Sequence, residues 1–277
     1  MDLKTLLETP PWEWPKNAAK EFHRILTDHH ATESDRLVAA GLAGDLTVMN
    51  DDLADALMQI LSSPDEPEPL RAASAISLGP VLEQADMGDF DELDDVPISE
   101  QTFQQIKSLL HRLYLDASID KEVLRRILEA SVRAPADWHR DAIRKAYAST
   151  DRDWKLTAVF AMRWVSGFDD QILTALNSSD AEIHCEAVQA AGNWEVSAAW
   201  SHVVSLVNDA ATPKPLLLAA IGAVGSIRPR EAGEILRKRA RSDDPEIAEA
   251  IEEAMLMAEG ISDEEDFEEE DASGWIN

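Results

Sequence analysis

Apolar residues recur along this chain in clusters roughly 31 residues apart, and within each cluster they have a helical spacing. We place seven copies and number repeat positions from the first residue of each copy, taken as zero. The copies start at Thr32, Pro67, Asp120, Asp151, Asp180, Pro213 and Asp244. Position 3 is apolar in six copies, and position 7 is small or apolar in all seven. Because these positions are one helical turn apart, they share a face, which predicts a helix in each copy.

A second apolar cluster follows the first in each copy, for example over residues 53–61 and 103–113, and predicts a second helix. Position 12 is glycine in four copies, where we predict a helix end or a tight turn. These glycines are Gly44, Gly79, Gly192 and Gly225. Val132 and Arg163 replace glycine in the third and fourth copies. No stretch alternates apolar and polar residues for long, so we expect almost no strand.

A period of this length is typical of a solenoid, because one helix pair cannot bury its apolar face alone. The sequence therefore predicts an all-α solenoid of about seven antiparallel helix pairs over residues 32–260. An irregular helical bundle whose segments are similar by accident is the alternative. We expect residues 1–31 to form an N-terminal cap, with a helix opening at Pro15 and with Trp12 and Trp14 folded back on the first copy.

The copies resemble the short bacterial form of the HEAT-like repeat, first noted in phycobilisome lyase subunits. The resemblance covers Thr32 to Gly260 and implies a right-handed superhelix whose second helices line a concave partner-binding surface. It also leaves open a role as a bilin lyase or lyase-chaperone subunit acting on a tetrapyrrole-carrying protein. Deoxyhypusine hydroxylases, which are HEAT-like enzymes, hold two irons with repeated His-Glu dipeptides. This chain contains no such dipeptide, so we do not expect that activity.

The formal net charge of −29 makes nucleic acid an unexpected partner, because phosphate binding needs clustered Lys and Arg. Acidic residues concentrate in an insertion at about 84–97 and in the tail, 261–277. We expect the insertion to be a loop between the two helices of one copy, and the tail to be disordered and solubilising. A protein or peptide with a basic patch fits this charge better, and an acidic chaperone or nucleic-acid mimic for basic proteins is a further alternative.

A single cysteine gives no disulfide framework and fits a reducing compartment. We find no apolar run long enough to span a membrane and no pattern of a signal peptide, so we expect a cytoplasmic monomer without a membrane partner. The chain has no phosphate-binding loop, no dinucleotide-binding glycine motif and no nucleophile elbow. Its seven histidines do not form a convincing ligand set, and we expect no metal and no cofactor.

What remains is a binding function, so we expect a non-enzymatic protein–protein interaction scaffold or adaptor that holds a protein or peptide on its concave surface. Tryptophan and arginine are the side chains richest in binding hot spots. The predicted partner-binding residues are Trp138, Arg140, Arg144, Trp164, Trp200, His202, Arg237 and Arg239. The alternative is that the tryptophans fill the repeat core and that the late basic residues complement a helix C-terminus.

Overall fold

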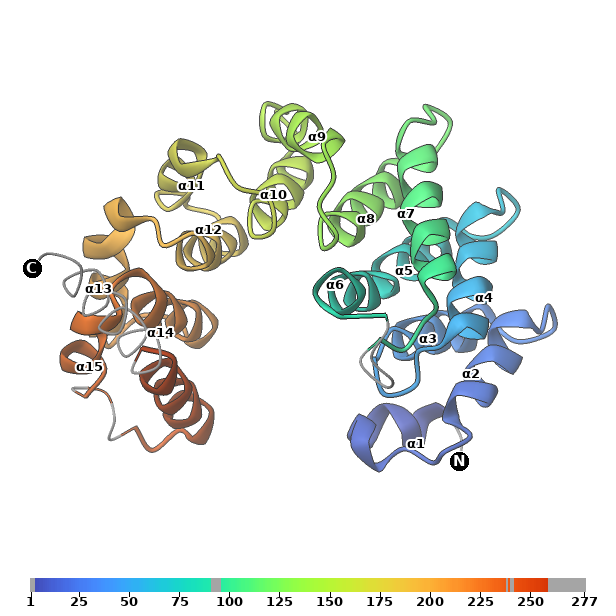
Figure 1. Cartoon of the computed structure of the whole chain (residues 1–277), viewed down its shortest axis with the longest axis horizontal. Coiled ribbons are helices and arrows are strands. Elements are labelled where there is room, and N and C mark those ends of the chain that lie inside the picture. The colour runs from blue at the N-terminus through green and yellow to red at the C-terminus, as the bar shows by residue number, and fades with distance from the viewer. Residues whose placement is uncertain (1–2, 91–95, 238, 240–241, 259–277) are drawn as a thin grey trace, which may run out of the picture. The chain divides into compact units, whose positions relative to one another are not determined.

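In the computed structural model, residues 3–90, 96–237, 239 and 242–258 are described. Every regular element among them is a helix, as the repeat pattern predicted. The chain divides into two compact units, Met1–Ala142 and Ile143–Asn277, and each unit is a stack of helices (Figure 1). The all-α repeat fold is therefore confirmed, while the handedness and curvature of the whole array stay predictions.

The first unit has a layer of first helices and a layer of second helices. The first helices are α3 (Glu33–Ala43), α5 (Glu68–Ser77) and α8 (Lys121–Ser131), each packed against the next. The neighbouring second helices are α2 (Ala18–Thr27), α4 (Asp51–Ser62) and α7 (Glu100–Tyr114). Before them lie α1 (Leu3–Glu8) and the short helix η1 (Pro11–Glu13). The boundary between the units falls within α9 (Trp138–Tyr147).

The second unit repeats this arrangement. Its first helices are α10 (Arg152–Ala161), α12 (Ala181–Asn193) and α14 (Lys214–Ile227), and α12 packs against both of the others. The corresponding second helices are α11 (Asp169–Ala175), α13 (Trp200–Asn208) and α15 (Pro229–Arg237). The short helix η2 (Ser197–Ala199) precedes α13. Residues 245–258 form the first helix of the seventh copy.

Burial at position 7 confirms the repeat register. All seven of these side chains are at most 2% exposed, in both units. They are Ala39, Ser74, Ile127, Ala158, Ala187, Ala220 and Ile251. Most are small, so neighbouring helices can approach closely at this position while the surface there is removed from water.

We predicted a helix end or a tight turn at the four position-12 glycines, and Gly44 is at a helix end, as the C-cap of α3, while the other three do not terminate a helix. Gly192 and Gly225 lie inside α12 and α14, and Gly79 opens a helix rather than ending one. Gly167, outside the repeat pattern, is the glycine with a positive φ, 91°, among the described residues. Backbone conformation is therefore not the reason for glycine at position 12.

Close approach of the next copy is the reason for these glycines. A Cβ atom on Gly192 would lie 2.9 Å from the Cα of Ala223, and one on Gly225 would lie 2.9 Å from the carbonyl oxygen of Ala254. Both neighbours hold position 10 of the following copy. In the seventh copy position 12 is Leu256, whose side chain is 62% exposed.

Two buried arginines tie α3 and α5 to the ends of the second helices that precede them. Arg36 donates from Nε and Nη2 to the Leu26 carbonyl, and its guanidinium also holds Glu66 at 2.7 Å through two hydrogen bonds. Arg71, which has the same repeat position, donates from Nε to the Leu61 carbonyl at 3.1 Å. The last carbonyls of a helix lack partners within the helix, so these arginines satisfy groups that burial would otherwise leave unpaired.

In the N-terminal segment α1 and α2 pack against α3, and three details of our prediction were wrong. The helix that carries Phe22 begins at Ala18 rather than Pro15. Trp14 folds back on the N-terminal segment itself rather than on the first copy, since its indole N–H donates to the Leu6 and Thr9 carbonyls and its ring meets Phe22 edge-on at 5.4 Å. Trp12 does not fold back, because it is 79% exposed.

The acidic insertion also differs from the predicted loop at its start. Residues 84–87 belong to an additional helix, α6 (Gly79–Met87), which packs against α7 and α8. The second copy therefore contains an additional helix, which explains why Pro67 and Asp120, the starts of the second and third copies, are 53 residues apart. Residues 91–95 and the tail, 261–277, lie outside the described residues.

Candidate functional site

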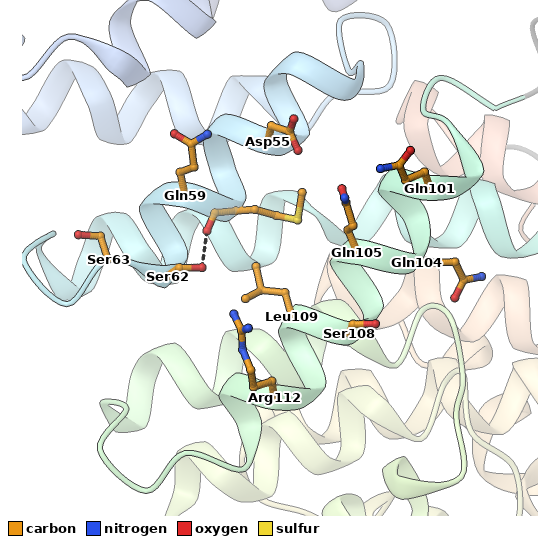
Figure 2. Close-up of a pocket in the computed structure, with 11 residues that line it drawn as sticks. Asp55, Gln59, Ser62, Ser63, Gln101, Gln104, Gln105, Ser108, Leu109 and Arg112 are labelled. Atoms are coloured by element: carbon orange, nitrogen blue, oxygen red, sulfur yellow. Dashed lines mark hydrogen bonds between the residues drawn. The ribbon is translucent and has the colours of Figure 1, made fainter.

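An open groove of about 960 Å³ lies between the second helices α4 and α7 of the first unit, and most of the surface exposed in it is carbon (Figure 2). Nine of the eleven residues along it are polar, which distinguishes it from the apolar contacts between first helices. The lining residues are Asp55, Met58, Gln59, Ser62, Ser63, Gln101, Gln104, Gln105, Ser108, Leu109 and Arg112.

The two helices start side by side because their N-terminal ends are hydrogen-bonded to each other. The carboxylate of Asp51, the first residue of α4, accepts from the backbone N–H of Ser99 at 2.9 Å and from its hydroxyl at 3.2 Å. Ser99 is the N-cap of α7, where its hydroxyl also accepts from the Thr102 N–H. Burial alone raises the pKa of Asp51, but the hydrogen bonds from Ser99 and Thr102 outweigh it and lower that pKa. The groove is thus flanked by two helices that run in the same direction.

Four of the nine polar residues of the groove are glutamines. Gln59 comes from α4, whereas Gln101, Gln104 and Gln105 come from α7, and all four are exposed. Within the described part of the chain, none of these amides is hydrogen-bonded to another group. Each amide has donors and an acceptor, so the groove presents unpaired groups of both kinds to a ligand.

The groove is also lined by two apolar side chains and by two side chains of opposite charge. Figure 2 shows Gln105 and Leu109 directed from α7 into the space between the helices. Met58 and Leu109 are its apolar residues, and Leu109 is 8% exposed. Asp55 lies toward the helix N-termini and Arg112 toward the opposite end (Figure 2). The groove therefore has a negative end, an apolar middle and a positive end.

Sequence reasoning missed this groove, because we searched for aromatic and basic residues. A signal was present in α7, where polar uncharged residues recur at the spacing of one helix face. Gln101, Gln104, Gln105 and Ser108 follow the i, i+3, i+4, i+7 pattern opposite the apolar stripe.

Trp138 packs within the first unit rather than standing out as a contact residue. Its ring stacks on His111 at 4.9 Å between centroids and lies 5.0 Å from the ring of Tyr114. Trp138 is half-buried, which agrees better with the alternative that the tryptophans fill the repeat core. Arg140 and Arg144, from the same helix, are exposed.

His139, beside Trp138, is buried and borders a hollow of about 190 Å³ next to α7. Its Nδ1 accepts from the Ala136 N–H at 2.9 Å, so its proton is on Nε2, which lies 3.0 Å from the Ser131 hydroxyl. Burial, together with the positive charges of Lys107 and His111, lowers the pKa of His139 to about 4. This histidine is therefore a neutral, doubly hydrogen-bonded structural group at neutral pH.

The predicted residues of the second unit form three small clusters. The Arg163 guanidinium lies 4.6 Å above the Trp164 ring, and that of Arg228 lies 5.2 Å above Trp200. His202 is 2.8 Å from His184 between their Nε2 atoms. Burial lowers the pKa of each histidine, which favours the neutral forms that such a contact requires.

Of the two predicted arginines late in the chain, one is exposed and the other is hydrogen-bonded to a backbone carbonyl. Arg237 is exposed in the last turn of α15, and Arg239 donates to the Asp209 carbonyl at 2.7 Å. Both positions fit the alternative that these cations complement nearby carbonyls. The role of all eight residues in partner binding stays a prediction.

The described residues offer little other chemistry. The described residues contain no group of three or more His, Cys, Asp or Glu side chains placed to hold a metal. Cys185 is half-buried, and burial raises the pKa of its thiol, which disfavours the reactive thiolate. Within the same described part, no helix is both long and apolar enough to span a membrane.

No protein-family model and no curated protein sequence matches this chain. Similar solved structures include human deoxyhypusine hydroxylase in complex with glycerol, which is 17% identical in sequence and has a TM-score of 0.41. The similarity covers 93% of this chain and 88% of that chain. An engineered protein has 17% identity, coverages of 88% and 97%, and a TM-score of 0.36. The E. coli protein YibA has 13% identity, coverages of 88% and 98%, and a TM-score of 0.44. The assignment of the repeat fold rests on the helices of this chain.

Proposed function

We propose that this protein is a non-enzymatic interaction scaffold, and that it binds a segment of a partner protein in the groove between α4 and α7. The observation that carries the proposal is the set of four unpaired glutamine amides around the apolar side chains of Met58 and Leu109. Such a surface can hydrogen-bond a protein backbone and bury a side chain at the same time. A helical repeat array supplies the rigid support that a binding surface needs.

The charge of the groove bears on the alternative of an acidic chaperone for basic proteins. Asp55 is its one carboxylate, and Arg112 opposes it with one guanidinium. The large negative charge of the chain is therefore not concentrated at this site. A neutral or mixed-charge segment suits the groove better than a strongly basic one.

Peptide selection against the full-length chain tests this proposal. A displayed library of random twelve-residue peptides is panned against the immobilised protein, and the selected peptides are measured by calorimetry. Ser108→Trp places a large ring in the groove and should weaken binding of these peptides by at least about tenfold. Ser179→Trp, at an exposed serine between α11 and α12, is the matched control and should leave binding unchanged. Equal binding by the parent and Ser108→Trp would refute the proposal.

A further inference from the structure

We infer that the groove takes an extended peptide of about five residues, with a basic side chain at the Asp55 end, an apolar side chain in the middle and an acidic side chain at the Arg112 end. This inference rests on the proposed function and adds the conformation and the charge pattern of the bound segment.

The length of the groove follows from helix geometry. Its lining residues on α7 run from Gln101 to Arg112, and a helix rises about 1.5 Å per residue, so they cover about 16 Å. An extended chain advances about 3.3 Å per residue, so about five residues match this length. A longer segment would project beyond the charged ends.

The amides favour an extended occupant over a helical one. A helix already satisfies the N–H and C=O groups in its interior, so it would leave the glutamine amides without partners. An extended chain exposes both kinds of group along its edge, and an amide can donate to one and accept from the other. Gln101 and Gln105 are one helical turn apart on α7 and lie along the groove (Figure 2).

The floor and the ends of the groove set the side-chain pattern. Met58 and Leu109 lie between the amides, where an apolar side chain of the ligand would be removed from water. Asp55 and Arg112 are exposed and opposite in charge. A ligand with one base and one acid can satisfy both ends, whereas a ligand with two like charges meets repulsion at one of them.

Three pools of capped, fluorescently labelled peptides test the charge pattern by polarisation at low salt. Each pool has a central leucine and mixed residues beside it, and the outer residues are lysine and glutamate, two glutamates or two lysines. The parent should bind the mixed-charge pool best, by about threefold to fivefold. Asp55→Lys should shift the preference to the two-glutamate pool, and Arg112→Glu should shift it to the two-lysine pool. Preferences that do not follow these substitutions overturn the charge pattern.

Methylation of the central backbone nitrogen tests the extended conformation. An N-methyl group removes one donor, so the modified mixed-charge peptide should bind the parent about fivefold to tenfold more weakly. In Gln105→Leu, which has no amide at that position, methylation should have a smaller effect. Peptides that bind in the groove as helices, shown by circular dichroism of the complex, would overturn this inference while leaving the proposed function intact. The proposed function itself would be refuted by a different result, namely that Ser108→Trp binds the selected peptides as tightly as the parent does.

Discussion

Asp51 and Ser99 join the N-terminal ends of α4 and α7, although α5, α6 and the acidic insertion lie between these two helices in the sequence. The Asp51 carboxylate accepts two hydrogen bonds from Ser99, one from its backbone N–H and one from its hydroxyl. The same hydroxyl caps α7 through the Thr102 N–H. This contact fixes the spacing of the helices at the Asp55 end of the groove, so it links the stability of the fold to the shape of the site.

Asp51→Ala should lower the free energy of unfolding by about 1 kcal/mol more than Asp52→Ala, measured by urea denaturation at pH 7. Asp52 is the matched control, because it is also an acidic residue in the first turn of α4. The pKa of Asp51 is lowered in the folded protein, so its carboxylate stabilises the fold above the unfolded-state pKa. The difference between the variants should shrink as the pH falls through the folded-state pKa, and a constant difference would contradict this assignment.

Gly225→Ala should lower the free energy of unfolding by about 2 kcal/mol, because its Cβ would press on the backbone of Ala254 at 2.9 Å. Gly222, in the same helix, has nothing within 4 Å of an added Cβ. Gly222→Ala should therefore raise the free energy of unfolding by about 0.5 to 1 kcal/mol, since alanine is the better helix former. Thermal or urea unfolding of both variants measures this contrast. Similar effects at the two sites would show that position 12 does not require close approach.

Arg36→Met should lower the free energy of unfolding by about 3 kcal/mol, because it leaves Glu66 and the Leu26 carbonyl without their buried partner. The double variant Arg36→Met/Glu66→Met should recover part of this loss, since no unpaired carboxylate remains. Arg24→Met is the surface control: Arg24 pairs with Glu21 but is 61% exposed, and no measurable change is expected. A double variant less stable than Arg36→Met would contradict the burial argument.

His139 should make the fold sensitive to acid between its unfolded and folded pKa values, from 6.5 to about 4. The folded-state pKa is lowered, so the unfolded chain takes up the proton first and stability falls as the pH drops through this range. The expected loss is roughly 3 kcal/mol, and it should be absent from the profile of His139→Gln. Denaturation at a series of pH values measures the loss, and NMR titration of the imidazole gives the pKa directly. A His139 signal that titrates near 6.5 would refute the prediction.

The first helices could be predicted from the sequence because their packing repeats at a fixed position. Ala187 and Ala220 are both fully buried, as position 7 requires. The glycines at position 12 were predicted to mark helix ends, which holds for Gly44 but not for Gly192 and Gly225, where close contact is the reason. A glycine pattern in the sequence does not distinguish a left-handed turn from a close contact, because the contact partner, such as Ala223, lies one copy further along.

The groove could not be found in the same way. Gln59 and Gln105 belong to different copies, and the irregular spacing caused by α6 and the insertion hides their alignment. Glutamine is common on helix surfaces, so these residues indicate a binding site only once α4 and α7 are seen to lie side by side. The ring contacts of Trp138 with His111 and Tyr114 were likewise not visible in the sequence, and its role in partner binding stays a prediction.

Leu256 has a consequence for how such a chain can lengthen or shorten during evolution. Where position 12 lies close against position 10 of the next copy, as at Gly192 and Gly225, only glycine fits, whereas α10 packs against α12 with Arg163 at this position. The whole copy is therefore the natural unit of duplication and deletion, because a shorter insertion would displace the glycine from its partner. The helix at 245–258 carries Leu256 at this position. A further copy joined after residue 258 would approach as closely as α14 approaches α12 only with glycine as residue 256.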